Sequence, residues 1–266
     1  MVDSHAHLEW PDFAADRDAV LARARAAGVV AILAIGSAAG TEQLDAAIPF
    51  AEQYDWVFAT VGLHPQLALD ARPEHLDRLQ EIAQHPRVIG FGEIGLDYYR
   101  DDAPRDVQQR LFRELLGVAR SAGRPVVIHC REAWPDTLEI LEQEWRTTGL
   151  GGILHCFSGT LEFARRGIEM GFLISFAGNI TYRKAEALRA VARALPLEAL
   201  LVETDAPFLP PEGFRGQRNE PARVVEVARA VADVRNLSFA ELAAATTANF
   251  ERLFRLRSGS LTGSRG

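Results

Sequence analysis

Six side chains of the kinds that bind divalent metals recur where short apolar segments of the sequence end. Imidazoles together with carboxylates suit Zn²⁺ or Mn²⁺, whereas sites richer in oxygen suit Mg²⁺. Each residue alone has an ordinary structural explanation, such as a hydrogen-bonded interior histidine or an ion-paired carboxylate. Burying so many titratable groups together without a cation would be very costly, so the set favours a metal site. The six are His5, His7, Glu93, His129, His155 and Asp205.

The elements that must position these side chains are eight apolar segments that alternate with stretches of helical periodicity. Near-continuous apolar segments such as VVAILAIGS and PVVIHC are typical of parallel strands buried on both faces. Alternation repeated eight times predicts a single-domain (β/α)₈ TIM barrel, and no G-x-G-x-x-G motif follows the first segment to favour an open doubly wound sheet. The predicted strands cover residues 1–7, 29–37, 57–65, 88–97, 125–130, 152–157, 171–178 and 200–207.

The stretches between the strands predict helices, for example over residues 16–27, 105–122 and 185–195. Two final helical segments, 221–234 and 239–256, are expected to pack outside the barrel as an addition to it. We therefore predict one hydrolase domain over residues 1–256 and a disordered tail over 257–266.

In such a barrel the carboxyl ends of the strands converge on one face, which is where active sites lie. His5 and His7 are two residues apart on one strand and therefore point the same way. Six ligands are enough for two divalent ions that share a bridging carboxylate, with Mg²⁺, Mn²⁺ and Zn²⁺ as the candidate metals. We choose Glu93 for the bridge, because its strand lies between the two histidine groups around the barrel.

The two cysteines, Cys130 and Cys156, each directly follow a histidine. Since side chains alternate along a strand, we expect both thiols to face the helix layer. They are then packing residues and not metal ligands.

Charge and hydropathy exclude some classes of protein. The formal net charge of −7 argues against a protein that coats duplex DNA through a large basic face. Lys184 is the only lysine, and the other basic residues are arginines. No apolar run is long enough for a membrane span, and the sequence MVDSHAHLEW lacks the pattern of a signal peptide. The sequence therefore predicts a cytoplasmic protein, and a monomer is our default expectation.

Seven motifs taken in order resemble the TatD family of metal-dependent deoxyribonucleases, within the amidohydrolase-like superfamily. They are DSHAHL, VGLHP, GEIGLDYYR, PVVIHCREA, LHCFSG, ETDAPFLPP and RGQRNEP. The resemblance runs from residue 2 to Phe254 and includes a late T-x-x-N-x-x-x-L-F pattern. It implies that His5, His7, Glu93 and Asp205 hold one ion, and that Glu93, His129 and His155 hold the second. A phosphotriesterase-like site is disfavoured, because those hydrolases carry a carbamylated lysine where this chain has Glu93.

The resemblance also implies an activity, the hydrolysis of DNA phosphodiesters from the 3′ end. We expect a metal-activated water to attack, with Asp205 as its acid–base partner and Glu93 as the second catalytic residue. The substrate is expected to be single-stranded DNA or frayed DNA ends.

Candidate substrate contacts follow several of the strands. His64 carries over from the family motif, and arginines match phosphate oxygens bidentately. The set is His64, Arg100, Arg131, Arg215, Arg218 and Asn219. Aromatic side chains beside them could stack on unpaired bases, although we expect Phe157 and Phe176 to be core residues. These aromatics are Tyr98, Tyr99, Phe157, Phe176, Tyr182, Phe208 and Phe214.

Two alternatives stay open from the sequence. The same ligands would serve a D-aminoacyl-tRNA deacylase or a small-molecule amidohydrolase, because metals polarise a carbonyl as readily as a phosphoryl group. A non-catalytic metal-binding scaffold is the alternative from another class. A structural site would need only four closed positions, which argues against the scaffold.

Overall fold

The computed structural model describes residues 1–100, 102–257 and 259–261 of the chain. Most of the predicted tail, residue 258 and residues 262–266, lies outside the described residues. No helix in the described part is both long and apolar enough to cross a membrane.

Eight parallel strands, each paired with the next, form the centre of the described part of the molecule. The strands are β1 (Val2–Ala6), β2 (Ala31–Ala34), β3 (Val57–Val61), β4 (Val88–Asp97), β5 (Val126–Arg131), β6 (Gly152–Leu154), β7 (Phe172–Phe176) and β8 (Leu200–Val202). The first and last strands meet just beyond β8, where His7 N donates to Ala206 O over 2.8 Å and Asp205 N donates to His5 O over 3.0 Å. The predicted (β/α)₈ barrel is thereby confirmed.

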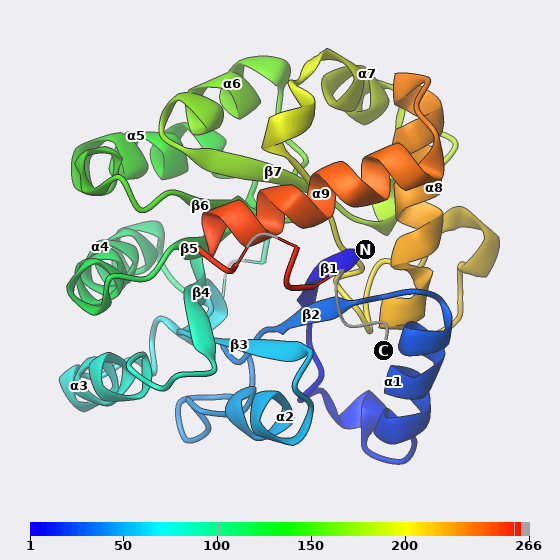
Figure 1. Ribbon diagram of the computed structural model, residues 1–266. Coiled ribbons are helices and arrows are strands. Elements are labelled where there is room, and N and C mark those ends of the chain that lie inside the picture. Colours follow the sequence, from blue (N-terminus) through cyan, green and yellow to red (C-terminus); the bar gives the residue numbers. More distant parts are fainter. Residues whose placement is uncertain (101, 258, 262–266) are drawn as a thin grey trace.

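Helices surround the strands on the outside (Figure 1). They are α1 (Arg17–Ala26), α2 (Ile48–Gln53), α3 (Pro73–Ile82), α4 (Arg105–Ala122), α5 (Trp134–Glu144), α6 (Leu161–Glu169), α7 (Glu186–Ala194) and α8 (Val224–Arg235), followed by α9 (Phe239–Leu253). The longest of them, α4, buries Leu111, Leu115 and Ala119 on one face, the spacing expected of an amphipathic helix. It ends at Gly123, whose φ of 67° is the left-handed conformation that favours glycine at a helix terminus.

The core has two parts because strand side chains alternate between the inside and the outside of the barrel. On β2, Ile32 belongs to the larger cluster, which also contains the helix residues Leu115 and Leu138. Ala31 and Leu33, its neighbours, belong to a separate cluster inside the barrel.

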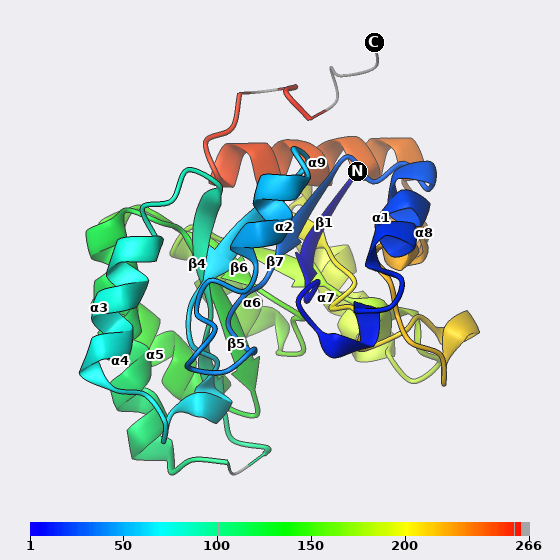
Figure 2. The same cartoon turned by 90° about the horizontal axis from the view of Figure 1, so that it is seen from below.

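The last helix closes the end of the barrel at which the strands begin. Figure 1 looks onto this end and shows α9 crossing it, and Figure 2 shows α9 and the N-terminus on the same side of the barrel. Phe250 is fully buried and joins the cluster of inward-facing strand residues. Asn249 Nδ2 donates to the carbonyls of Leu197 and Leu200 over 2.8 and 2.9 Å, which ties α9 to the start of β8. Both final helices therefore lie outside the barrel as expected, α8 in the outer ring and α9 across one end.

We expect Phe250→Ala to lower the free energy of unfolding by about 3–5 kcal/mol, because it removes a fully buried ring and leaves a cavity. Equilibrium urea unfolding measures the change. Phe239→Ala is the matched control on the same helix, since Phe239 is 38% exposed and its loss should cost within about 0.5 kcal/mol. Equal stabilities of the two variants would contradict the role of α9 as the closing element.

Candidate metal centre

Glu93 lies at an irregularity of β4 that determines where its carboxylate points. The register with β5 runs Gly92 to Val127 and then Ile94 to Ile128, so Glu93 is an extra residue in the ladder. A bulge of this kind redirects a side chain. Gly92 and Gly95 flank it with φ of 149° and 145°, and a Cβ at either would lie 2.5 Å or less from a β5 carbonyl oxygen. The GEIG motif is thus explained by close packing of two backbones around an inward-facing glutamate.

The first group of ligands faces one oxygen of that glutamate. His5 Nε2 lies 3.6 Å and His7 Nε2 lies 3.8 Å from Glu93 Oε2. Asp205 Oδ1 lies 3.6 Å from His5 Nε2 and 3.5 Å from His7 Nε2. Asp205 reaches this position from a left-handed backbone conformation, with φ of 55°, just after β8. These four donors surround one point at the carboxyl end of the barrel.

The second group faces the other oxygen of Glu93. His129 Nδ1 lies 2.6 Å and His155 Nε2 lies 2.7 Å from Glu93 Oε1. One carboxylate therefore stands between two sets of ligands, one oxygen toward each, which is the arrangement a bridging ligand requires. The structure brings all six predicted ligands together.

Three buried carboxylates hold the outer nitrogens of the histidines. Asp97 Oδ2 lies 3.2 Å from His129 Nε2, Glu203 Oε1 lies 3.0 Å from His155 Nδ1, and Glu9 Oε1 lies 3.1 Å from His7 Nδ1. Such partners fix the tautomer of a metal-binding histidine and raise its basicity. Sequence reasoning missed all three. The available signal was their spacing, because Glu9 and Glu203 each lie two residues from a ligand and Asp97 lies four from Glu93.

The inward-facing nitrogens are suited to a cation. A proton on the outer nitrogen of His7 or His155 leaves a lone pair on Nε2, which then faces other acceptors. His5 Nε2 and His7 Nε2 are only 3.2 Å apart, and His155 Nε2 faces a carboxylate oxygen. Two lone pairs at this separation repel unless a proton or a metal ion lies between them, so the donor set fits divalent metals.

Protons balance these charges when no metal is bound. Burial opposes the charged form of His7, but Glu9, Asp205 and Glu93 outweigh it and raise its pKa to about 10. Burial likewise opposes the charged form of His155, yet Glu93 and Glu203 raise its pKa well above the ordinary value. Metal ions must therefore displace protons from this site.

A buried hydrogen-bonded pair beneath the site joins the first strand to the segment after the last. Asp3 Oδ2 accepts from Thr204 Oγ1 over 2.6 Å, and Asp3 Oδ1 accepts from Thr204 N over 2.8 Å. Burial raises the pKa of Asp3 to about 8, and the bonds from Thr204 offset only part of that rise. Asp3 and Thr204 fix the relative positions of the strands that carry His5 and Asp205.

His64 lies beside the second group, and its ligand atoms come within metal-binding distance of those of Glu93 and His129. Its Nδ1 accepts from Gln66 N over 3.2 Å, so a neutral His64 carries its proton on Nε2. That Nε2 lies 3.8 Å from Glu93 Oε1. Burial and the neighbouring His129 lower the pKa of His64 to about 3, which keeps the ring neutral. His64 therefore presents an N–H group to whatever binds beside Glu93.

Three of the predicted arginines are exposed around the mouth. Arg131, at the end of β5, lies over the Tyr99 ring with Cζ 3.8 Å from its centroid. Arg215 lies over Tyr182 at 4.5 Å. Arg100 is exposed in the loop that follows β4. Guanidinium groups can bind phosphate oxygens bidentately, although Arg215 Nη1 also lies 3.9 Å from Glu212 Oε2.

Two other residues predicted as substrate contacts hold the loop after β8 instead. Arg218 forms a bidentate ion pair with Asp16, with both N–O distances at 2.8 Å. Asn219 is fully buried and donates through Nδ2 to the carbonyls of Thr204 and Phe208. Their bonding is internal to the protein, so we assign both to positioning the loop.

The aromatic residues divide between core and mouth. Phe157 and Phe176 are buried, as expected, whereas Phe208 is 40% exposed. Phe208 packs edge-on against His7 and against Trp10, a mouth residue that sequence reasoning missed.

The cysteines have different environments. Cys130 Sγ accepts from Thr137 Oγ1 on α5 over 3.3 Å, as expected for a thiol facing the helix layer. Cys156 lies beyond the end of β6 with φ of 44°, where strand alternation no longer applies. Its backbone N–H donates to Glu203 Oε1 over 2.7 Å. Burial raises the pKa of its thiol, and Asp205 and Glu203 raise it further.

Comparison with known proteins agrees with this geometry. The family model described as TatD related DNase matches residues 2–255. An uncharacterized metal-dependent hydrolase of Bacillus subtilis, YabD, is 39% identical over 96% of this chain and 99% of its own. The 3′–5′ ssDNA/RNA exonuclease TatD of Cronobacter turicensis is 37% identical over 96% of this chain and 97% of its own.

Among solved structures, the TatD homologue YjjV of Escherichia coli superposes with a TM-score of 0.91 at 34% identity, covering 97% of this chain and 98% of that one. A barrel with this ligand set, matched along nearly its whole length, belongs to the TatD family of metal-dependent hydrolases.

Proposed function

We propose that this protein is a nuclease that removes nucleotides from the 3′ ends of single-stranded DNA, using two divalent ions chosen from Mg²⁺, Mn²⁺ and Zn²⁺. The observation that carries the proposal is the position of Glu93, with one oxygen toward each group of histidines. A relative that is 37% identical and is named as a 3′–5′ ssDNA/RNA exonuclease supports the choice of substrate. The exposed guanidinium groups of Arg131 and Arg215 support a substrate that carries phosphates.

Divalent ions held by the six ligands would lower the pKa of a water molecule and stabilise negative charge on the phosphoryl oxygens. Asp205 is placed to orient this water and accept its proton. Its Oδ1 faces the first histidine group, and its Oδ2 has no hydrogen bond to any residue that the structure describes. Its side chain is 14% exposed, compared with 3% for Glu93, so Asp205 lies closer to incoming substrate.

His64 and the arginines would act on the substrate itself. The His64 N–H can donate to a non-bridging phosphate oxygen, and a hydrogen bond to a charged group contributes about 1.5–3 kcal/mol. Arg131 and Arg215 would hold neighbouring phosphates from their positions on tyrosine rings.

Metal removal with EDTA should abolish hydrolysis of end-labelled single-stranded DNA, and Mn²⁺ or Mg²⁺ should restore it. The expected content by elemental analysis is two ions per chain in the wild type and fewer in Glu93→Gln, which loses the bridge. Titration calorimetry should show binding that releases protons and tightens as pH rises, because metal-free His7, with a pKa of about 10, is protonated at neutral pH. Full activity in thoroughly stripped protein would refute the catalytic role of the metals.

Asp205→Asn should keep at least one ion and lose about 10²–10⁴-fold in kcat, the usual contribution of a general base. Steady-state hydrolysis of a labelled oligonucleotide measures the loss. Asp102→Asn is the matched control, since Asp102 is an exposed residue of the loop after β4. An Asp205→Asn protein as fast as this control would rule out the proposed role.

His64→Ala should leave the metal content unchanged and lower kcat/KM by about 10–100-fold, because it removes a donor to phosphate and no ligand. Metal analysis and kinetics on the same preparation separate the two effects. If the variant lost an ion, His64 would be a ligand after all.

A further inference from the structure

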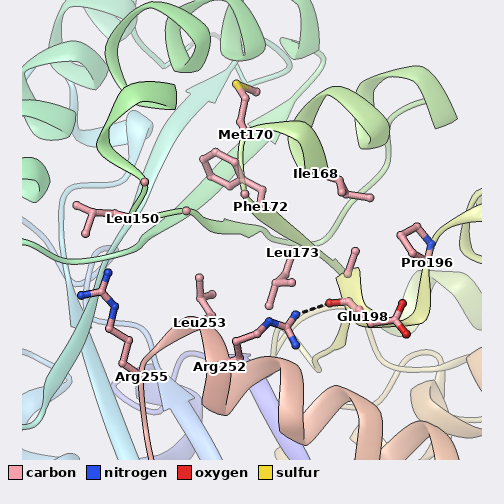
Figure 3. A pocket seen from close by; sticks show the side chains of 14 residues that line it. Leu150, Ile168, Met170, Phe172, Leu173, Pro196, Glu198, Arg252, Leu253 and Arg255 are labelled. Atoms are coloured by element: carbon pink, nitrogen blue, oxygen red, sulfur yellow. Dashed lines mark hydrogen bonds between the residues drawn. The ribbon is translucent and has the colours of Figure 1, made fainter.

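Pockets indent the described part of the molecule at both ends of the barrel. One of ≈ 410 Å³ lies against α9, where Arg252 donates to the carbonyl of Glu198 (Figure 3). The other, of ≈ 850 Å³, lies at the carboxyl end of the strands and is lined by residues of α5, α6 and α7. Its size falls in the range of about 300–1,000 Å³ typical of small-ligand sites.

The floor of the larger pocket is aromatic and apolar. Trp134 and Phe163 contribute nearly parallel rings, with centroids 6.2 Å apart and planes 19° apart, and Leu188 of α7 also lines the pocket. A Cβ at Gly159 would lie 3.0 Å from Trp134 Cε2, so the chain passes this ring only as glycine. Asn179 also lines the pocket, although its Oδ1 is itself buried.

The rim of this pocket is polar and carries one free positive charge. Lys184, the only lysine in the chain, lines the pocket and has no ion pair with a described residue. The hydroxyl-bearing Ser158 is exposed at the same rim. By contrast, the preceding residue, Arg183, has an ion-pair partner, since its Nε lies 3.6 Å from Glu212 Oε1.

Residues that line the pocket lie close in sequence or in contact to residues of the mouth of the metal centre. Ser158 and Gly159 come from the LHCFSG motif, directly after the ligand His155. Tyr182 lines the pocket with the same ring that carries Arg215 on the mouth. A chain bound at the metal centre could therefore extend along Tyr182 into this pocket.

We infer that the pocket binds nucleotides of a single-stranded nucleic acid that lie beyond the scissile phosphodiester. A base packs against the Phe163 ring, while Lys184 contacts a backbone phosphate. Stacking platforms combined with cationic contacts are how proteins hold single strands without reading sequence. The inference rests on the proposed nuclease function and adds to it a second point of attachment that only a longer strand can reach.

Kinetics on substrates of different length test the inference. Lys184→Glu and Phe163→Ala should each raise KM for a long oligothymidylate by about tenfold and leave kcat nearly unchanged. Hydrolysis of a thymidine dinucleotide and of bis(p-nitrophenyl) phosphate should stay at the wild-type level, because neither reaches the pocket. Affinity for the long oligothymidylate falls as the salt concentration rises. The magnitude of the slope of log affinity against log salt concentration should be smaller by about 0.7 in Lys184→Glu, the value for one phosphate contact on a single strand.

Arg110→Glu is the matched control, since it makes the same charge change at an exposed position of α4. Thermal unfolding of each variant excludes simple misfolding. If KM for the long strand were the same in Lys184→Glu and Arg110→Glu, the inference would be overturned while the proposed nuclease function stood.

The single lysine permits a second test that does not depend on turnover. Amine acetylation followed by peptide mass spectrometry can modify only Lys184 and the terminal amine. A phosphorothioate oligothymidylate bound to the metal-loaded protein should slow modification of Lys184, and an unchanged rate would overturn the inference. A wild-type protein that cleaves no nucleic acid would refute the proposed function alone. The slower acetylation of Lys184 in the presence of the oligonucleotide would still decide whether the pocket binds a strand.

Discussion

The site depends on one carboxylate placed between two groups of imidazoles. Glu93 can occupy this position because β4 has an extra residue there and because glycines on either side let β5 approach closely. A regular strand would have kept the ordinary alternation, and the glutamate would not have been directed between both groups. The backbones of β4 and β5 therefore determine the geometry of the metal centre.

Much of this could be predicted from the sequence. Buried parallel strands are recognisable as apolar segments, and the closure of a barrel forces their carboxyl ends together. His5 and His129 could be placed on that face because side-chain alternation holds within a strand, and His7 follows directly after β1. The same rule does not reach Cys156, because β6 ends at Leu154 and the next residues turn.

Other features were not visible in residue type or periodicity. The pattern of α9 shows that one face is apolar, but not that this face covers the end of the barrel where Phe250 inserts. Arg218 is of a residue type that often contacts phosphate. Its guanidinium is instead bound by Asp16, about two hundred positions away along the chain. Glu203 resembles any buried acid until His155 is seen beside it. The roles of such residues depend on which partners folding brings beside them, and these partners cannot be identified from a single sequence.

Covering one end of the barrel with α9 also has a practical consequence for how the protein can be handled. The N-terminus and α9 lie at the same end of the barrel, and the metal centre lies at the other (Figure 2). A linker fused ahead of Met1 therefore leaves from the side opposite the metal centre. A protein coupled to a bead or surface through such a linker would present the end of the barrel that carries the metal centre to solution.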